Sequence, residues 1–282
     1  MSSYFEMTEI TIKESRLAEL AKSFSEKASV PDLDKSIVKD LVNSSEGTET
    51  DTTKFDDNGN PYMKDGELLP NNTYELNGNV YTTDDQGRII SCEATPKSTP
   101  ENPRDNKAQE QSGGEDRRDG DQGGHIVGRD MGGDSGAGNL VPMDGRLNQS
   151  DFKRMENEIK KALSDGKDVT TKTEFTYSGD SKRPDKITVT VTIDGKVTVY
   201  TFDNNLDGSL MEKVAETYSE TEVENVQSVL DETGGEVSSI KEKYDSEGNL
   251  VKTTVTITYS GEDGRTYRTT VVIDHAGGGS QQ

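Results

Sequence analysis

Alternating apolar and polar residues run through much of the chain after residue 70, and this alternation predicts short β-strands. It first appears in residues 72–77, 80–84 and 88–94, where Asn77-Gly78 and Asp85-Gln86-Gly87 provide the turns of a meander. It returns in residues 171–177, 186–193 and 196–202, and again in residues 251–259 and 266–273. We therefore expect an antiparallel sheet.

Helical periodicity occupies fewer segments. Residues 8–23 and 34–43 carry apolar side chains on one face, and residues 42–53 follow as a polar linker. Residues 150–163 are predicted to form an amphipathic helix, and a further helical stretch covers residues 210–230. The buried stripe of the first of these two helices consists of Phe152, Met155, Ile159 and Leu163. Residues 95–124 hold three prolines and many charges and are predicted to be irregular, and the tail 276–282 is predicted to be disordered.

The order of these elements predicts an α+β fold. Residues 1–60 are expected to be an N-terminal helical arm and linker, and residues 61–205 a central domain. Residues 206–282 are expected to be a small C-terminal α+β extension, made of a helix, a β-hairpin and the disordered tail. The central domain contains strands, a glycine-rich segment with His125, one helix and then more strands.

Composition limits the core and the compartment. Hydrophobic residues make up 28% of the sequence, so we expect a modest core. No apolar run reaches membrane-spanning length and the N-terminus has no conventional signal peptide, so no membrane partner is expected. The single Cys92 excludes an internal disulfide, and one cysteine with two histidines cannot build a structural zinc site.

The formal net charge of −22 opposes simple electrostatic capture of nucleic acid. Basic side chains nevertheless gather around one part of the sequence: Arg117, Arg118, Arg129, Arg146, Lys153, Arg154, Lys160 and Lys161. A bound cation there would add local positive charge. Any binding of nucleic acid is therefore expected to be weak and sensitive to salt.

His125 is the first candidate for chemistry. It follows Gly123-Gly124, where backbone can approach a ligand closely, and a neutral imidazole can take a proton from water. The alternative is that His125 is a structural residue. The second histidine, His275, ends a predicted strand beside Ala276 and a run of glycines, and we interpret it as incidental.

Asn148 and Glu156 are the next candidates. The amide oxygen of Asn148 could hold a divalent cation, although an Asn just before an apolar periodicity is also typical of a helix N-cap. Glu156 lies eight residues later, about 12 Å along a helix and close to the same face. Its carboxylate could accept hydrogen bonds from metal-bound water, or it could form a solvated pair with Lys160.

Taken together, these residues resemble the DNA/RNA non-specific endonuclease family, whose active site is a ββα-metal core. The matching motifs are Gln122-Gly123-Gly124-His125, Asn139-Leu140-Val141-Pro142, Leu147-Asn148-Gln149 and Met155-Glu156-Asn157. The resemblance is strongest over residues 120–163 and extends loosely over 70–205. It is closest to nuclease modules of bacterial polymorphic toxins, including type VII secretion effectors, which share the segment seen here at residues 177–184.

The resemblance implies roles for these residues. His125 would deprotonate the attacking water, Asn148 would hold one Mg²⁺, with Mn²⁺ as a possible substitute, and Glu156 would orient metal-bound water. The family has an arginine where this chain has Gly123. Arg129 and Arg146 are the candidates to replace it, with Arg117 and Arg118 in reserve, and the sequence does not choose between them.

The function expected is that of a Mg²⁺-dependent endonuclease that cleaves DNA, RNA or both without sequence preference. The resemblance further implies a bacterial toxin module, either secreted without a conventional signal peptide or cytoplasmic, and a cognate immunity protein as its partner. The alternative is a catalytically inactive, acidic interaction or immunity-type protein on a nuclease-like scaffold. The roles of residues 1–60 and 206–282 stay open.

Overall fold

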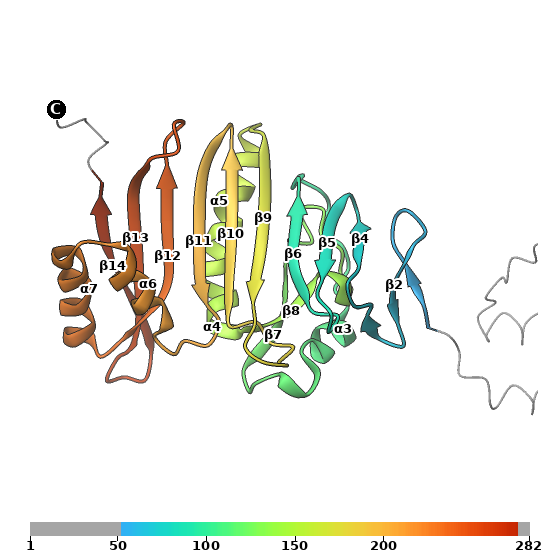
Figure 1. Cartoon of the computed structure of the whole chain (residues 1–282), viewed down its shortest axis with the longest axis horizontal. Coiled ribbons are helices and arrows are strands. Elements are labelled where there is room, and N and C mark those ends of the chain that lie inside the picture. Colours follow the sequence, from blue (N-terminus) through green and yellow to red (C-terminus); the bar gives the residue numbers. More distant parts are fainter. Residues whose placement is uncertain (1–51, 276–282) are drawn as a thin grey trace, which may run out of the picture. The chain divides into compact units, whose positions relative to one another are not determined.

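The computed structural model describes residues 52–275, which form an α+β fold on one large antiparallel sheet (Figure 1). Nine strands pair in the order β14-β13-β12-β11-β10-β9-β6-β5-β4. They are β4 (Thr73–Leu76), β5 (Asn79–Thr83), β6 (Ile89–Ala94), β9 (Val169–Thr176), β10 (Lys186–Ile193), β11 (Lys196–Asp203), β12 (Glu236–Tyr244), β13 (Leu250–Ser260) and β14 (Thr266–Asp274). The predicted α+β class with an antiparallel sheet is confirmed.

Two smaller sheets and several helices complete the fold. One sheet holds β1 (Lys54–Phe55), β2 (Pro61–Lys64) and β3 (Glu67–Leu68), and the other pairs β7 (Asp121–His125) with β8 (Leu140–Asp144). The helices before β9 are α3 (Asn106–Gln111), η1 (Gly114–Asp116), η2 (Ala137–Asn139), α4 (Gly145–Leu147), the π-helical turn η3 (Asn148–Phe152) and α5 (Lys153–Ser164). Those after β11 are α6 (Ser209–Thr217) and α7 (Glu220–Thr233).

The β7–β8 hairpin and the helical run α4–η3–α5 form a β-β-α unit that is inserted between two neighbours of the large sheet. Strands β6 and β9 are hydrogen-bonded partners, with Ser91 opposite Glu174 and Ala94 opposite Thr171. The whole β-β-α unit lies in the intervening sequence. Its helix α5 buries Met155, Ile159 and Ala162, while the predicted fourth stripe residue, Leu163, is partly buried against the same core.

The two hydrophobic cores lie on opposite faces of the large sheet. Successive residues of a strand point to opposite faces. On β11, the Tyr200 hydroxyl donates to Glu158 of α5 at 2.9 Å, whereas the Thr201 hydroxyl accepts a hydrogen bond from Lys213 of α6 at 3.2 Å. Helix α5 therefore covers one face, and α6 and α7 cover the other (Figure 1). The second core contains Leu210, Val214, Val226, Val237, Ile240, Val255 and Ile257.

Several element predictions need correction. The irregular segment 95–124 contains helix α3, which is capped by Asp105. The predicted helix at 210–230 is two helices, because the chain breaks at Tyr218 and restarts with a capping box of Ser219 and Glu222. Strands β1 to β3 and β12 were not predicted. The predicted helices at 8–23 and 34–43 and the disordered tail lie outside the described residues.

The C-terminal segment continues the same sheet as the central segment. Strand β11 pairs with β12 from Thr198–Lys243 to Phe202–Ser239. The predicted boundary at residue 205 therefore falls between two hydrogen-bonded strands. Among residues 52–275, no helix has the length and apolar character needed to cross a membrane.

Candidate active site

A cavity of about 550 Å³ brings together four of the five predicted site residues. His125 from β7, Arg129 from the loop after it, Asn148 from η3 and Glu156 from α5 all line this cavity. Arg146 of α4 does not; its Nε lies 3.5 Å from Asp144 Oδ1. The cavity walls carry five basic and four acidic side chains. The cavity therefore does not share the strong net negative charge of the whole chain.

His125 ends strand β7, whose first four residues belong to the segment predicted to be irregular. It pairs with Leu140 of β8. A Cβ atom at Gly123 would lie 2.7 Å from Gln109 Cα of α3, and one at Gly124 would lie 2.8 Å from Met143 Cε. The two glycines are therefore needed for the close packing of β7 against α3 and β8.

The environment of His125 favours the neutral imidazole. Its Nε2 atom is buried and has no hydrogen-bond partner among residues 52–275. Burial, and then the positive charges of Arg129 and Arg104, lower the pKa of His125 to about 4. The ring is therefore neutral at neutral pH, which leaves one nitrogen able to accept a proton.

Asn139 holds the loop that follows His125. Its side chain is fully buried and donates to the carbonyls of Val127 and Asp134 at 2.8 and 2.7 Å. Its oxygen accepts hydrogen bonds from the Val127 backbone N–H and the Tyr81 hydroxyl. All of these contacts are internal, so the Asn139-Leu-Val-Pro motif shapes the loop around the cavity.

Asn148 opens the π-helical turn η3. Turns of this kind often mark functional sites. Its Nδ2 donates to Gln122 Oε1 at 2.9 Å, and its Oδ1 accepts no hydrogen bond within the described part of the chain. The N-cap alternative for Asn148 is wrong, because Asp144 caps the helix by accepting hydrogen bonds from the N–H groups of Arg146 and Leu147.

Glu156 lies on α5 two turns after Asn148 and is half-buried. Burial raises its pKa; the charge of Asp130 acts in the same direction, while Lys160 and Lys153 oppose it. The expected alternative, an ion pair with Lys160, is not formed, because Lys160 Nζ pairs with Asp130 Oδ2 at 2.8 Å. The carboxylate of Glu156 thus faces the cavity without a direct cationic partner in residues 52–275.

The predicted arginines are mostly engaged elsewhere. The guanidinium of Arg129 donates to the Asn102 carbonyl and to the Glu101 carboxylate. Arg117 lines the cavity, but its Nη1 donates to the Gln109 carbonyl at 2.7 Å. Arg118, the other reserve candidate, is not part of the cavity wall.

Arg104 was not predicted as a site residue. This residue lines the cavity, is exposed, and forms no hydrogen bond or ion pair with any residue from 52 to 275. It precedes Asp105, whose carboxylate accepts a hydrogen bond from the Ala108 N–H at 2.9 Å and so caps α3. The Asp followed by a run of helix-forming residues was the available signal, hidden by the prediction of an irregular segment.

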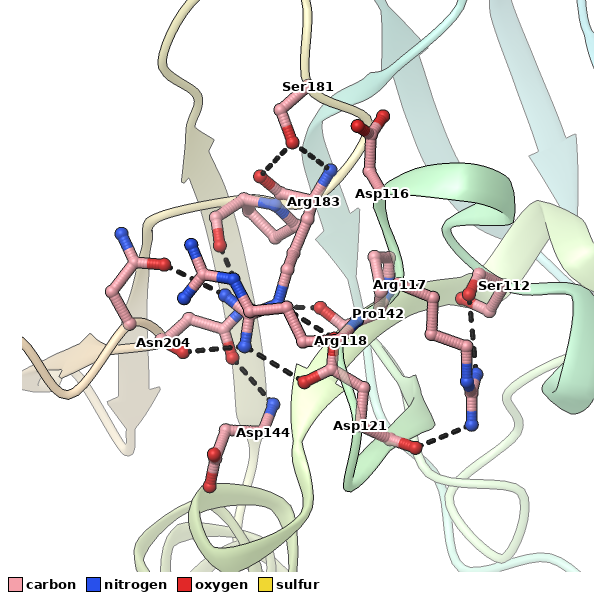
Figure 2. Close-up of polar contacts among 12 residues, drawn as sticks. Ser112, Asp116, Arg117, Arg118, Asp121, Pro142, Asp144, Ser181, Arg183 and Asn204 are labelled. Atoms are coloured by element: carbon pink, nitrogen blue, oxygen red, sulfur yellow. Dashed lines mark hydrogen bonds and ion pairs between the residues drawn. The ribbon is translucent and has the colours of Figure 1, made fainter.

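A buried polar cluster fixes the end of the hairpin opposite His125 (Figure 2). Arg183 binds both carboxylate oxygens of Asp121, at 2.8 and 2.9 Å, and the two side chains are 3% and 1% exposed. Asn204 accepts a hydrogen bond from the Asp144 N–H and donates to the carbonyls of Pro142 and Pro184. Because Asp121 begins β7 and Asp144 ends β8, this cluster joins the hairpin to the region around β10 and β11.

The donor set suits an oxygen-liganded cation held by few protein groups. No group of three or more His, Cys, Asp or Glu residues able to hold a metal exists within residues 52–275. The cavity instead offers the unengaged carbonyl oxygen of Asn148 and the carboxylate of Glu156. Mg²⁺ in proteins takes oxygen ligands and keeps several of its waters, so it tolerates such a sparse set.

Comparison with curated proteins finds relatives in Staphylococcus aureus. The type VII secretion system protein EssD of strain USA300 is 36% identical over 126 residues, which is 42% of this chain and 20% of that protein. EssD of strains NCTC 8325 and Newman matches equally. The match therefore spans about one fifth of the length of these relatives.

A family model locates the similarity along the chain. The DNA/RNA non-specific endonuclease model matches residues 70–195, a range that includes His125, Asn148 and Glu156. This family is metal-dependent. Residues 70–195 therefore match the DNA/RNA non-specific endonuclease family.

Proposed function

We propose that this chain hydrolyses phosphodiester bonds of DNA, RNA or both, without sequence preference and with Mg²⁺ as its metal. The observation that carries the proposal is the shared cavity of His125, Asn148 and Glu156 inside the endonuclease domain. A neutral imidazole, an unengaged amide oxygen and a half-buried carboxylate are the groups that metal-assisted hydrolysis needs.

Each residue has a defined task in this proposal. His125 takes the proton of the attacking water, and its low pKa keeps it unprotonated at neutral pH. Asn148 would hold the metal through Oδ1, since its Nδ2 is already bound to Gln122. Glu156 accepts hydrogen bonds from water in the cavity. The metal, when bound, supplies positive charge that stabilises the phosphate and the leaving oxygen.

Arg104 is the best candidate for binding the phosphate. Phosphate recognition by arginine uses the planar guanidinium with several free N–H donors. Arg104 has all its donors free within residues 52–275, whereas the donors of Arg129 are used by Glu101 and Asn102. Arg129 then acts on the site through its charge near His125. No role in the reaction is assigned to Arg146.

The similarity to EssD extends the proposal to biological context. We propose a bacterial toxin module that is secreted, and a cognate immunity protein that protects the producing cell. Residues 1–60 are proposed as an N-terminal arm and linker, with the correction that Lys54–Phe55 at its end pairs with β2. The bounds 61–205 and 206–282 remain our proposed division of the rest.

The test is a cleavage assay on plasmid DNA and on single-stranded RNA, with Mg²⁺, with Mn²⁺ and with EDTA. Wild-type protein is expected to degrade at least one substrate in Mg²⁺ and none in EDTA. His125→Ala is expected to abolish cleavage. His275→Ala is the matched control, because the other histidine contacts Thr253 and lies outside the cavity.

Cleavage by His125→Ala at the wild-type rate would refute the assigned base. Absence of cleavage by the wild type in both metals would refute the proposed activity and favour the inactive interaction protein.

A further inference from the structure

The segment that follows the endonuclease domain contacts the turn that carries Asn148. Asp151, in the same turn η3, is buried with 6% exposed. Its carboxylate accepts hydrogen bonds from Arg268 Nη1 of β14 at 2.8 Å and from Ser238 Oγ of β12 at 2.9 Å. Both donors lie beyond residue 195, where the family match ends.

A β-bulge in β12 directs Ser238 towards Asp151. The strand register skips Ser238, because Val237 and Ser239 pair with consecutive residues of β13. Val237 and Ile240 both belong to the core beneath α6 and α7. The two serines between them therefore both face the other side of the sheet, where η3 and α5 pack.

The hydrogen bond between Ser238 and Asp151 is buried. The Ser238 hydroxyl is also an acceptor, for the Thr258 hydroxyl of β13 at 2.9 Å, and Ser238 is 3% exposed. Arg154 adds a longer ion pair at 3.7 Å from the solvent side. A buried carboxylate is stable only with such partners, so the position of Asp151 is set by β12, β13 and β14.

We infer that residues 206–275 are a positioning element for the metal-binding end of the site, acting through Asp151 on Asn148. The inference rests on the proposed function. Asn148 lies three residues before Asp151 in a π-helical turn. This turn departs from the regular hydrogen-bond pattern of an α-helix, so the helical hydrogen bonds alone do not fix the conformation of Asn148. Asp151, Ser238 and Arg268 are positioning residues, since they line no part of the cavity.

The experiment measures Mn²⁺ binding to the full chain by the EPR signal of the free ion, which does not require cleavage. Arg268→Met is the main variant and Ser238→Ala a milder one. Arg265→Met is the matched control, because Arg265 precedes the same strand with 81% of its side chain exposed. Wild type and Asn148→Ala define the range, and thermal unfolding verifies that each variant is folded.

Arg268→Met is expected to weaken Mn²⁺ binding about tenfold, as loss of a supporting contact around a metal ligand does. Ser238→Ala should weaken it less, and Arg265→Met should leave it unchanged. If both Arg268→Met and Ser238→Ala bind Mn²⁺ with wild-type affinity, this inference is overturned and the proposed metal site is not affected. If Arg268→Met does not fold, Ser238→Ala decides. Equal Mn²⁺ binding by wild type and Asn148→Ala, or none by the wild type, would overturn the proposed metal site as well.

Discussion

Replacing Arg183 by methionine should destabilise the protein strongly, because it leaves the carboxylate of Asp121 buried without its cation. Arg183 donates to both oxygens of Asp121 and also to the Asn204 carbonyl and the Asn205 side chain. Both members of the ion pair are almost fully buried. Removing one partner of such a pair typically costs about 3–5 kcal/mol, a large part of the roughly 5–15 kcal/mol that stabilises a domain.

The assay is urea unfolding of the full chain, followed by fluorescence and circular dichroism. Lys182→Met is the matched control, since the neighbouring Lys182 pairs with Glu67 at the surface with both side chains about half exposed or more. Such a pair contributes about 0–1 kcal/mol. The double variant Arg183→Met with Asp121→Asn should recover part of the loss, because no charge is then left buried.

The loss should also depend on pH. Burial alone would raise the pKa of Asp121, but hydrogen bonds from Arg183 and the Arg118 N–H, and the charges of Arg183 and Arg117, hold it below its ordinary value. In the wild type this stabilisation is present above about pH 4 and is lost as the pH falls through the folded pKa. Without Arg183 burial raises the pKa, so the difference between variant and wild type should shrink as the pH falls from 7 towards 4. A loss below about 1 kcal/mol at pH 7, equal to that of Lys182→Met, would refute the reasoning.

Three further predictions concern the site. The acid limb of kcat/KM should lie near pH 4 and not near the ordinary histidine pKa of about 6.5. Arg104→Met should move this limb to higher pH, because the charge of Arg104 lowers the pKa of His125. Initial cleavage rates across pH 4 to 8 test both expectations. Arg104→Ala should lower kcat/KM on an oligonucleotide about 100-fold. Lys107→Ala should have little effect, because Lys107 lies on the face of α3 that lines a different cavity. Equal losses in the two variants would point to damage of α3. Gly123→Ala should destabilise the protein by about 1–3 kcal/mol, because its Cβ would meet Gln109 Cα at 2.7 Å, and a wild-type urea midpoint would contradict that packing.

Much of the large sheet could be predicted because its strands alternate regularly. Residues 73–76, 79–83 and 186–192 bury every second side chain, so the sequence pattern reflects the burial directly. Strand β12 was not predicted, because it lacks this regular alternation. Its bulge at Ser238 places two successive polar residues on one face and breaks the period of two.

The residues that carry the proposed chemistry were easier to predict from the sequence than the residues that hold them in position. His125, Asn148 and Glu156 stand in recognisable motifs, and the structure brings them to one cavity. Arg104 was hidden because α3 has only six residues and buries only Ala108, which is too little for a visible periodicity. The contact between Asp151 and Arg268 joins residues 117 positions apart, and no local pattern records such a contact.

The β-β-α unit is inserted between β6 and β9, so the pairing of these two strands closes a long loop that contains the candidate site. Ser91 and Glu174 meet across 83 residues of chain, and every predicted site residue lies in that interval. Closing so long a loop costs about 2 kcal/mol more in chain entropy than closing one of ten residues. A chain that is still unfolded, or that is being threaded through a narrow passage, has no assembled site. For the proposed nuclease, folding therefore serves as a form of latency, because an unfolded chain cannot cleave nucleic acid.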